Sequence, residues 1–192
     1  RSLRTWEAPT PCPPPGVSEE ADQARIAAAE ATVEAMDQVA PRMRSMLPQS
    51  ATGPTEDHDL MSLELTSQVF LSMGRLPTYA EWLLSRPADH MERVYRYERR
   101  VLQLLQWRSG PKRWQLKSPT HTLFLDGFER VFPEARYVMT HRDPSRVLVS
   151  VSDVYYTLGA PANDGLDPAE VGELNLMQWG IALDRCMAFR DA

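Results

Sequence analysis

The sequence predicts an α/β fold in which a parallel sheet is flanked by helices, because one local pattern occurs twice. Two short apolar runs, residues 113–117 and 135–141, have the length and composition of strands. Each run leads into a cation, a polar residue and a proline, as Lys-Ser-Pro at 117–119 and Arg-Asp-Pro at 142–144. Serine and aspartate are favourable N-caps, and proline is favoured at the first helical position. A strand, a crossover helix and a second strand predict parallel pairing.

The N-terminal part of the chain is predicted to be extended and then helical. Residues 1–16 include a Cys-Pro-Pro-Pro run that we interpret as a rigid connector. Ser18 is placed to cap a long, alanine-rich helix with an acidic first turn. Pro41 should end this helix, because proline lacks the backbone N–H that the helix needs.

Apolar residues at helical spacing predict three further helices, over residues 60–73, 78–84 and 87–107. Gly74 should close the first of them. The Glu-Asp-His-Asp run at 56–59 has ligating side chains, but consecutive residues rarely point at one ion. We therefore interpret this run as a helix start and predict no metal site.

Helical spacing also follows both prolines of the repeated pattern, and a last helix should begin at Asp167-Pro168. Residues 157–167 are predicted to be a loop, because glycine, proline and asparagine are frequent there. The expected core residues of the last helix are apolar: Leu174, Met177, Ile181, Leu183 and Met187.

Composition indicates an ordinary globular domain and excludes several classes of protein. The chain has 192 residues, which suits one domain over residues 1–192, with 43% hydrophobic and 24% charged residues. A net charge of −5 gives no basic face for nucleic acid, and no apolar run is long enough to cross a membrane. The two cysteines form no Cys-x-x-Cys pair, which favours a reducing, cytoplasmic location.

The spacing around the second proline resembles a known family. Ser150 follows Arg142 by eight residues, and a Lys-Ser-Pro-x-His stretch lies upstream at 117–121. These features resemble the sulfotransferases that use 3′-phosphoadenosine 5′-phosphosulfate (PAPS), in particular the broad bacterial family with a P-loop-like fold. Thr-Trp-Glu at 5–7 and Phe-Pro-x-Ala-Arg at 132–136 are similar as well. The resemblance implies transfer of a sulfuryl group from PAPS to a hydroxyl or amine of a small-molecule or glycan acceptor, without a metal.

One family feature has no counterpart in this sequence. The family opens with a strand and a Gly/Ser/Thr-rich loop that cradles the 5′-phosphosulfate, and no such loop occurs here. We therefore interpret the sequence as an internal fragment that has no activity by itself. Its fold should be rich in helices and incomplete at the N-terminus. Two alternatives stay open: a nucleotide-binding or scaffold fragment without turnover, and a relative of the P-loop kinases, although no Walker loop is present.

The resemblance assigns phosphate binding to residues around the Arg-Asp-Pro motif. Arg142 would hold the 3′-phosphate of PAPS, because a guanidinium can donate two hydrogen bonds to one phosphate. Ser150 would add a hydroxyl donor, and Ser145 in the first helical turn would assist. Lys117 would neutralise the charge that develops on the departing phosphate.

Two residues are candidates for the base that deprotonates the acceptor. Glu7 lies beside Trp6, shortly after the place of the phosphosulfate loop in the family, and a carboxylate kept from bulk water gains affinity for protons. His121 lies in the first turn after Pro119, where the helix dipole disfavours the imidazolium form. From the sequence we rank Glu7 ahead of His121, which stays the alternative.

Overall fold

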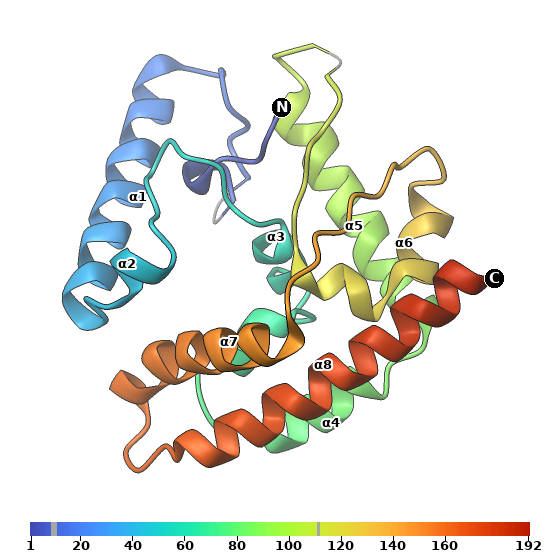
Figure 1. Cartoon of the computed structure of the whole chain (residues 1–192). Coiled ribbons are helices and arrows are strands. Elements are labelled where there is room, and N and C mark those ends of the chain that lie inside the picture. The colour runs from blue at the N-terminus through green and yellow to red at the C-terminus, as the bar shows by residue number, and fades with distance from the viewer. Residues whose placement is uncertain (9–10, 111) are drawn as a thin grey trace. The chain divides into compact units, whose positions relative to one another are not determined.

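The computed structural model describes residues 1–8, 11–110 and 112–192, which form two compact units (Figure 1). The first unit contains Arg1–Thr66 and Arg96–Ser118, and the second contains Ser67–Tyr95 and Pro119–Ala192. The chain passes between the units after Thr66, after Tyr95 within a long helix, α5 (Ala88–Gln106), and after Ser118.

The predicted parallel sheet is not formed, and that prediction is wrong. The described residues contain helices and only two isolated β-bridges: Ser2 pairs with Gln115 in parallel, and Arg4 pairs with Pro54 in antiparallel fashion. Residues 135–141 are without helix or bridge, and Val138 there is 91% exposed. An extended segment becomes a strand only when a neighbour supplies its hydrogen bonds, and this part of the described chain offers none to residues 135–141.

The remaining elements are α-helices and short 3₁₀-helices (η). In chain order they are η1 (Thr5–Glu7), α1 (Glu19–Val39), α2 (Met43–Met46), α3 (His58–Ser62), η2 (Gln68–Ser72), α4 (Pro77–Leu84), α5 (Ala88–Gln106), η3 (Pro119–Leu123), α6 (Leu125–Val131), α7 (Pro144–Gly159), η4 (Ala160–Ala162) and α8 (Pro168–Asp191).

In the first unit, the capped helix predicted after Ser18 is confirmed as α1. The Ser18 side chain accepts a hydrogen bond from the Ala21 N–H at 3.1 Å, and the helix ends at Val39, shortly before Pro41. The prediction of a single helix over residues 60–73 is wrong. It is replaced by α3 and η2, with Leu65 between them at φ 54°, and an α-helix cannot continue through a residue in the left-handed region.

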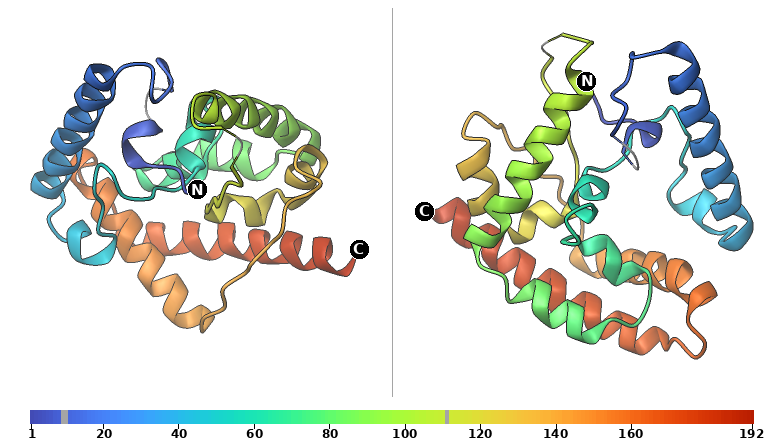
Figure 2. Two further views of the ribbon diagram at one scale, coloured as in Figure 1. Left: turned by 90° about the horizontal axis from the view of Figure 1, so that it is seen from above. Right: turned by 180° about the vertical axis from the view of Figure 1, so that it is seen from behind.

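In the second unit, helix α8 provides a surface on which α7, α6 and η3 pack. Figures 1 and 2 show α7 and α8 side by side. The predicted start of α8 is confirmed, because the Asp167 side chain accepts a hydrogen bond from the Ala169 N–H at 2.8 Å. This cap places Pro168 at the first helical position.

The face of α8 that is buried differs from the predicted one. Met177, Leu183 and Met187, expected in the core, are each 44–47% exposed. The buried positions instead follow a stripe at helical spacing that includes two amides: Val171, Asn175, Gln178, Ala182 and Cys186. The prediction failed because apolar side chains are distributed around the whole helix, so hydropathy does not select one face.

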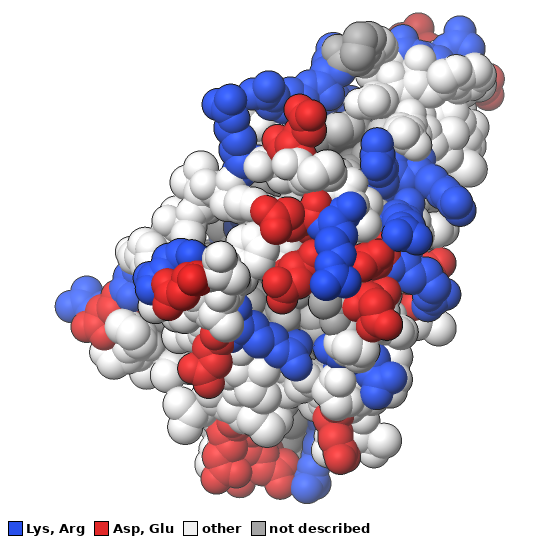
Figure 3. Space-filling view, turned by 90° about the vertical axis from the view of Figure 1, so that its right-hand side faces the viewer, with Lys and Arg blue, Asp and Glu red and all other residues white. Residues whose placement is uncertain are grey.

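The surface carries charges of both signs. On the face that Figure 3 shows, basic and acidic side chains are interspersed rather than gathered by sign. In the second unit, for example, Arg130 pairs with Glu92 at 2.8 Å. No helix among the residues that the structure describes has both the length and the apolarity to cross a membrane.

Candidate functional site

The start of α7 has the predicted arrangement of a cation, a cap and a proline. Asp143 is the N-cap, and its Oδ1 accepts hydrogen bonds from the Ser145 N–H at 2.9 Å and from the Ser145 hydroxyl at 2.7 Å. These bonds lower the pKa of Asp143 below its usual value. The carboxylate therefore stays ionised and satisfies the first N–H donor of the helix.

Arg142 and Ser150 flank this capped turn. Arg142 lies immediately before the cap, Ser150 lies in α7, and both side chains are exposed. Five residues separate Ser145 from Ser150, so the two lie about 7.5 Å apart along the helix axis. The N-terminal half of α7 thus presents a guanidinium and a hydroxyl to solvent beside the positive end of a helix dipole, where an anion is stabilised.

His121 is half-buried among aromatic rings of the second unit. Its Nδ1 lies 3.1 Å from the Tyr95 hydroxyl oxygen, and its ring centroid lies 4.7 Å from that of Phe128. The expected first helical turn is the 3₁₀-helix η3, and the helix predicted after Pro119 is divided into η3 and α6 at Phe124, whose φ of −142° is not helical. The Tyr95 contact orients the imidazole.

Lys117, in the first unit, is held by an acidic neighbour that is distant in sequence. Its Nζ donates to Glu56 Oε1, and the other oxygen of Glu56 lies 2.9 Å from His58 Nδ1. Partial desolvation lowers the pKa of Lys117 from its ordinary value. The acidic run at 56–59 is a helix start as predicted, since α3 begins at His58, but the ion pair with Lys117 was not predicted. No group of side chains that could hold a metal ion is present among the described residues.

Glu7 is almost fully buried, and both of its carboxylate oxygens are engaged. Oε1 accepts from the Arg1 guanidinium at 2.5 Å, and Oε2 accepts from the Arg4 backbone N–H at 2.9 Å. The Arg1 guanidinium also lies over the Trp114 ring, 4.4 Å from its centroid. Glu7 therefore ties η1 to the N-terminal segment of the first unit.

Glu7 and Lys117 follow two segments that run in the same direction. The Gln115 N–H donates to the Arg1 carbonyl at 2.9 Å, beside the parallel bridge between Ser2 and Gln115. Glu7 therefore follows the extended segment around Ser2, and Lys117 follows the extended segment around Gln115 that runs parallel to it. In the second unit, Ser145 and Ser150 lie on α7, Arg142 lies just before its N-cap, and His121 lies on η3.

A pair of buried carboxyl groups was not predicted from the sequence. Asp57 at the start of α3 and Glu98 in α5 are both fully buried in the first unit. Burial raises the pKa of Glu98 well above its usual value, and the charge of the neighbouring Asp57 raises the pKa further. The signal was present in the sequence, because Glu98 falls on the apolar face of the helix predicted over residues 87–107.

Comparisons with known proteins agree with the family resemblance. A family model described as "Sulfotransferase family" matches residues 6–192. Two crystal structures are similar over the whole chain: sulfotransferase STF9 from Mycobacterium avium, with 29% identity and a TM-score of 0.82, and sulfotransferase STF1 from Mycobacterium tuberculosis H37Rv, with 25% identity and a TM-score of 0.73. This chain spans 49% of the first structure and 52% of the second. A search of curated proteins found no match.

Proposed function

This chain belongs to the sulfotransferase family, and on that premise we propose that it takes part in transferring a sulfuryl group from PAPS to a hydroxyl or amine of a small-molecule or glycan acceptor. The observation that carries the proposal is the start of α7, where exposed Arg142 and Ser150 flank a capped helix N-terminus. We further propose a cytoplasmic location, with which the two free cysteines, Cys12 and Cys186, are compatible.

In the proposed reaction, the acceptor oxygen or nitrogen attacks the sulfur of PAPS. The bond between sulfur and the bridging phosphate oxygen breaks, and the electron pair of that bond stays on the phosphate. The acceptor loses its proton to a base, so the products are the sulfated acceptor and adenosine 3′,5′-bisphosphate. The protein must hold the nucleotide, neutralise the departing phosphate and accept the proton.

Arg142 and Ser150 are proposed to hold the 3′-phosphate. The exposed guanidinium can donate two parallel hydrogen bonds, and Ser150 can donate one from the next turns of α7. The Ser145 hydroxyl already donates to Asp143, so in this proposal Ser145 assists by keeping the capped turn in place. When the nucleotide binds, its 3′-phosphate would replace water around the Arg142 guanidinium.

Lys117 is proposed to neutralise the departing phosphate. An ammonium with a lowered pKa remains a hydrogen-bond donor, and its pairing with Glu56 limits the directions in which Nζ can point. Binding a dianionic phosphate would draw Lys117 from Glu56, because the more highly charged partner attracts the ammonium more strongly.

For the base, we propose His121 over Glu7. Both oxygens of the Glu7 carboxylate are already engaged, because Oε1 accepts from the Arg1 guanidinium and Oε2 accepts from the Arg4 N–H. His121 has one ring nitrogen oriented by Tyr95. If Nδ1 carries the proton and donates to the Tyr95 oxygen, Nε2 has the lone pair that a base requires.

The nucleotide site is tested by replacing Arg142 with alanine. We expect adenosine 3′,5′-bisphosphate to stabilise the chain against heat, and the Arg142→Ala variant to bind it about 10- to 100-fold more weakly, since a hydrogen bond to a charged group contributes about 1.5–3 kcal/mol. Calorimetric titration measures the affinity, with 5′-AMP as the ligand that lacks the 3′-phosphate.

Arg136→Ala is the matched control, because Arg136 is also an exposed arginine of the second unit and its loss changes net charge equally. Equal binding of the bisphosphate by both variants would remove Arg142 from the site. No binding by the wild-type chain would contradict the proposed nucleotide site altogether.

The base is tested by comparing His121→Asn with Glu7→Gln. We expect His121→Asn to lower kcat about 10²-fold or more with the affinity for adenosine 3′,5′-bisphosphate unchanged. Glu7→Gln should mainly lower the melting temperature, because it weakens the bond to Arg1. Loss of kcat in Glu7→Gln with the fold intact would assign the base to Glu7. Nucleotide binding without any turnover by the wild-type chain would agree with the expectation that this sequence has no activity by itself, and it would leave the base unassigned.

A further inference from the structure

Four side chains of the first unit form a continuous series of polar contacts that begins at Lys117. The Lys117 Nζ donates to Glu56 Oε1, and Glu56 Oε2 lies 2.9 Å from His58 Nδ1. On the other side of the imidazole, His58 Nε2 lies 3.3 Å from Asp59 Oδ1. These four residues form the Lys117 relay, in which a histidine lies between two carboxylates and is connected to the lysine by one of them.

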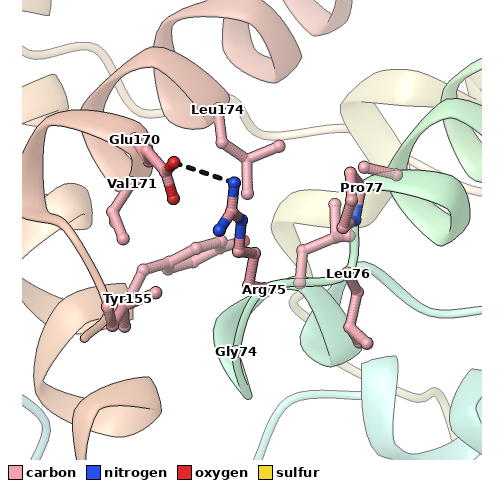
Figure 4. Close-up of a pocket in the computed structure, with 11 residues that line it drawn as sticks. Gly74, Arg75, Leu76, Pro77, Tyr155, Glu170, Val171 and Leu174 are labelled. Atoms are coloured by element: carbon pink, nitrogen blue, oxygen red, sulfur yellow. Dashed lines mark ion pairs between the residues drawn. The ribbon is translucent and has the colours of Figure 1, made fainter. Parts of the chain in front are cut away.

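An ordinary ion pair of the second unit shows what distinguishes the Lys117 relay. Arg75 Nη2 lies 2.9 Å from Glu170 Oε1 beside a cavity of about 210 Å³, and Figure 4 shows this pair. An arginine and a glutamate both keep their charge near neutral pH, so such a pair exchanges no proton. The Lys117 relay contains a histidine, the side chain whose charge changes in this pH range. It can therefore respond to the loss of one charge by gaining another.

The contacts of His58 suit the protonated imidazole. A neutral imidazole has one N–H and donates to one acceptor, whereas an imidazolium donates from both ring nitrogens. His58 faces a carboxylate oxygen at each nitrogen, from Glu56 on one side and from Asp59 on the other. The Asp59 carboxylate is held in place, because its second oxygen, Oδ2, accepts from the Thr55 hydroxyl at 3.2 Å. The positive charge of Lys117 opposes a proton on His58, because the two cations would share Glu56.

The backbone fixes the segments that carry the relay, so Lys117 can leave Glu56 without unfolding. The Asp57 N–H donates to the Lys117 carbonyl at 3.3 Å, which joins the two segments independently of their side chains. The Lys117 side chain is 72% exposed and has room to turn, whereas that of Glu56 is 26% exposed. The Asp57 carboxyl group lies against Glu98 of α5 instead of in the relay. A change at Lys117 is therefore passed on through Glu56.

We propose that Glu56 is a positioning residue for Lys117, and that His58 binds a proton and replaces Lys117 as the cation beside Glu56 when a phosphate draws the lysine away. The proton comes from solvent, which His58 reaches because its side chain is 21% exposed. Glu56 then keeps a cationic partner throughout, so its carboxylate is never left half-buried and unpaired. That a phosphate is the group that draws Lys117 rests on the proposed function.

The proposal has a thermodynamic consequence for binding. The complex holds more protons than the free chain and free ligand, so binding of a dianionic phosphate is accompanied by proton uptake. By linkage, the affinity for that phosphate increases as pH falls through the range in which His58 titrates. A purely structural role of Glu56 and His58 would change stability without changing the number of protons bound.

The first test requires no ligand and measures the titration of the His58 imidazole by NMR. We expect the midpoint in Lys117→Met to lie about 0.5 pH unit or more above that of wild type, a roughly threefold gain in affinity for the proton. Lys112→Met is the matched control and should match wild type, because Lys112 is also an exposed lysine of the first unit. In a Glu56→Gln background, Lys117→Met should move the midpoint less than half as far, because Lys117 is then no longer held beside His58.

The second test counts the protons taken up when adenosine 3′,5′-bisphosphate binds, by calorimetric titration at pH 7 in buffers of different ionisation enthalpy. We expect wild type to take up about 0.3 proton or more per ligand beyond His58→Asn. His90→Asn, the same substitution in the second unit, is the control and should match wild type. A thermal melt of each variant checks that it is folded.

The inference is overturned if the His58 midpoint is the same in wild type and Lys117→Met, or if both lysine variants raise it equally. Equal proton uptake by wild type and His58→Asn on binding the bisphosphate would overturn it as well. A raised midpoint in Lys117→Met without any bisphosphate binding would support the relay and count against the proposed nucleotide site. Bisphosphate binding with an unchanged midpoint would support the nucleotide site and reject the relay.

Discussion

Replacing Glu98 with glutamine is expected to stabilise the chain by about 2 kcal/mol at pH 8, although the residue is fully buried. Glu98 and Asp57 lie together out of water, and two such carboxyl groups cannot both ionise without a large penalty. Glutamine has the same shape and can donate its N–H to the Asp57 carboxylate. The amide therefore keeps the contact and removes the acid that resists ionisation.

The contribution of Glu98 to the free energy of unfolding should decrease as pH rises. Burial and Asp57 raise the pKa of Glu98 in the folded chain well above its usual value of 4.5, so the folded state retains this proton where the unfolded chain has lost it. The contribution of Glu98 to the free energy of unfolding therefore has its highest value below pH 4.5. It falls as pH rises from 4.5 toward the raised pKa of the folded chain. The Glu98→Gln variant should lose this decline and match wild type near pH 4.5.

Urea unfolding at pH 5, 6, 7 and 8 measures this difference, with Glu30→Gln as the control. Glu30 is an exposed glutamate on α1 of the same unit, so its replacement changes charge without touching the buried pair. The same pH dependence in wild type and Glu98→Gln would show that the buried pair does not titrate as described. Glu98→Ala should instead destabilise the chain by about 3 kcal/mol, because it leaves a cavity beside Asp57.

Replacing Gln178 with leucine is expected to destabilise the chain by about 3 kcal/mol, because the shorter apolar side chain cannot make the hydrogen bonds of the amide. Gln178 is fully buried in the second unit, where its Oε1 accepts from Gln68 Nε2 at 2.8 Å and its Nε2 donates to Asn175 Oδ1 at 2.8 Å. It also hydrogen-bonds Tyr155, whose pKa burial raises to about 12. Leucine would leave these buried polar partners without Gln178.

A double variant separates lost hydrogen bonds from a change in shape. Gln68→Leu combined with Gln178→Leu removes both members of one bond, so it should be less destabilising than the sum of the single changes by at least about 1 kcal/mol. Gln103→Leu, at an exposed position of α5, is the control for the substitution itself. Additive effects of the two single changes would show that the amides do not depend on each other.

Predictions from the sequence were most successful for helix starts, where the residues that form the cap are close together in the chain. The starts of α1, α7 and α8 each combine a Ser or Asp cap with a compatible first turn, and the structure places each cap within hydrogen-bonding distance of its backbone N–H. Residues two or three apart satisfy these bonds, so tertiary context has little to add. One motif of the family resemblance, Arg-Asp-Pro with Ser150, lies at the start of α7, and the resemblance is confirmed by the family model.

Predictions that required distant partners were less successful. Residues 113–117 and 135–141 have strand composition, but a strand exists only with a hydrogen-bonded neighbour, and composition does not identify one. The pairing of Lys117 with Glu56 joins residues 61 positions apart, so no local spacing indicates it. The roles of Arg142 and Ser150 remain predictions: Ser150 lies in α7, and Arg142 lies just before the N-cap of that helix.

The sequence by itself therefore determined where α1, α7 and α8 begin, which motifs the chain carries and to which family it belongs, because short-range geometry and residue order encode these properties. The tertiary structure alone decided which side of α8 is buried. In α8, Asn175 and Gln178 are in the interior while Met177 is exposed, because the buried amides satisfy one another and Gln68 across the unit. Hydropathy ranks residues one at a time, whereas burial of a polar group depends on whether a partner from another element reaches it.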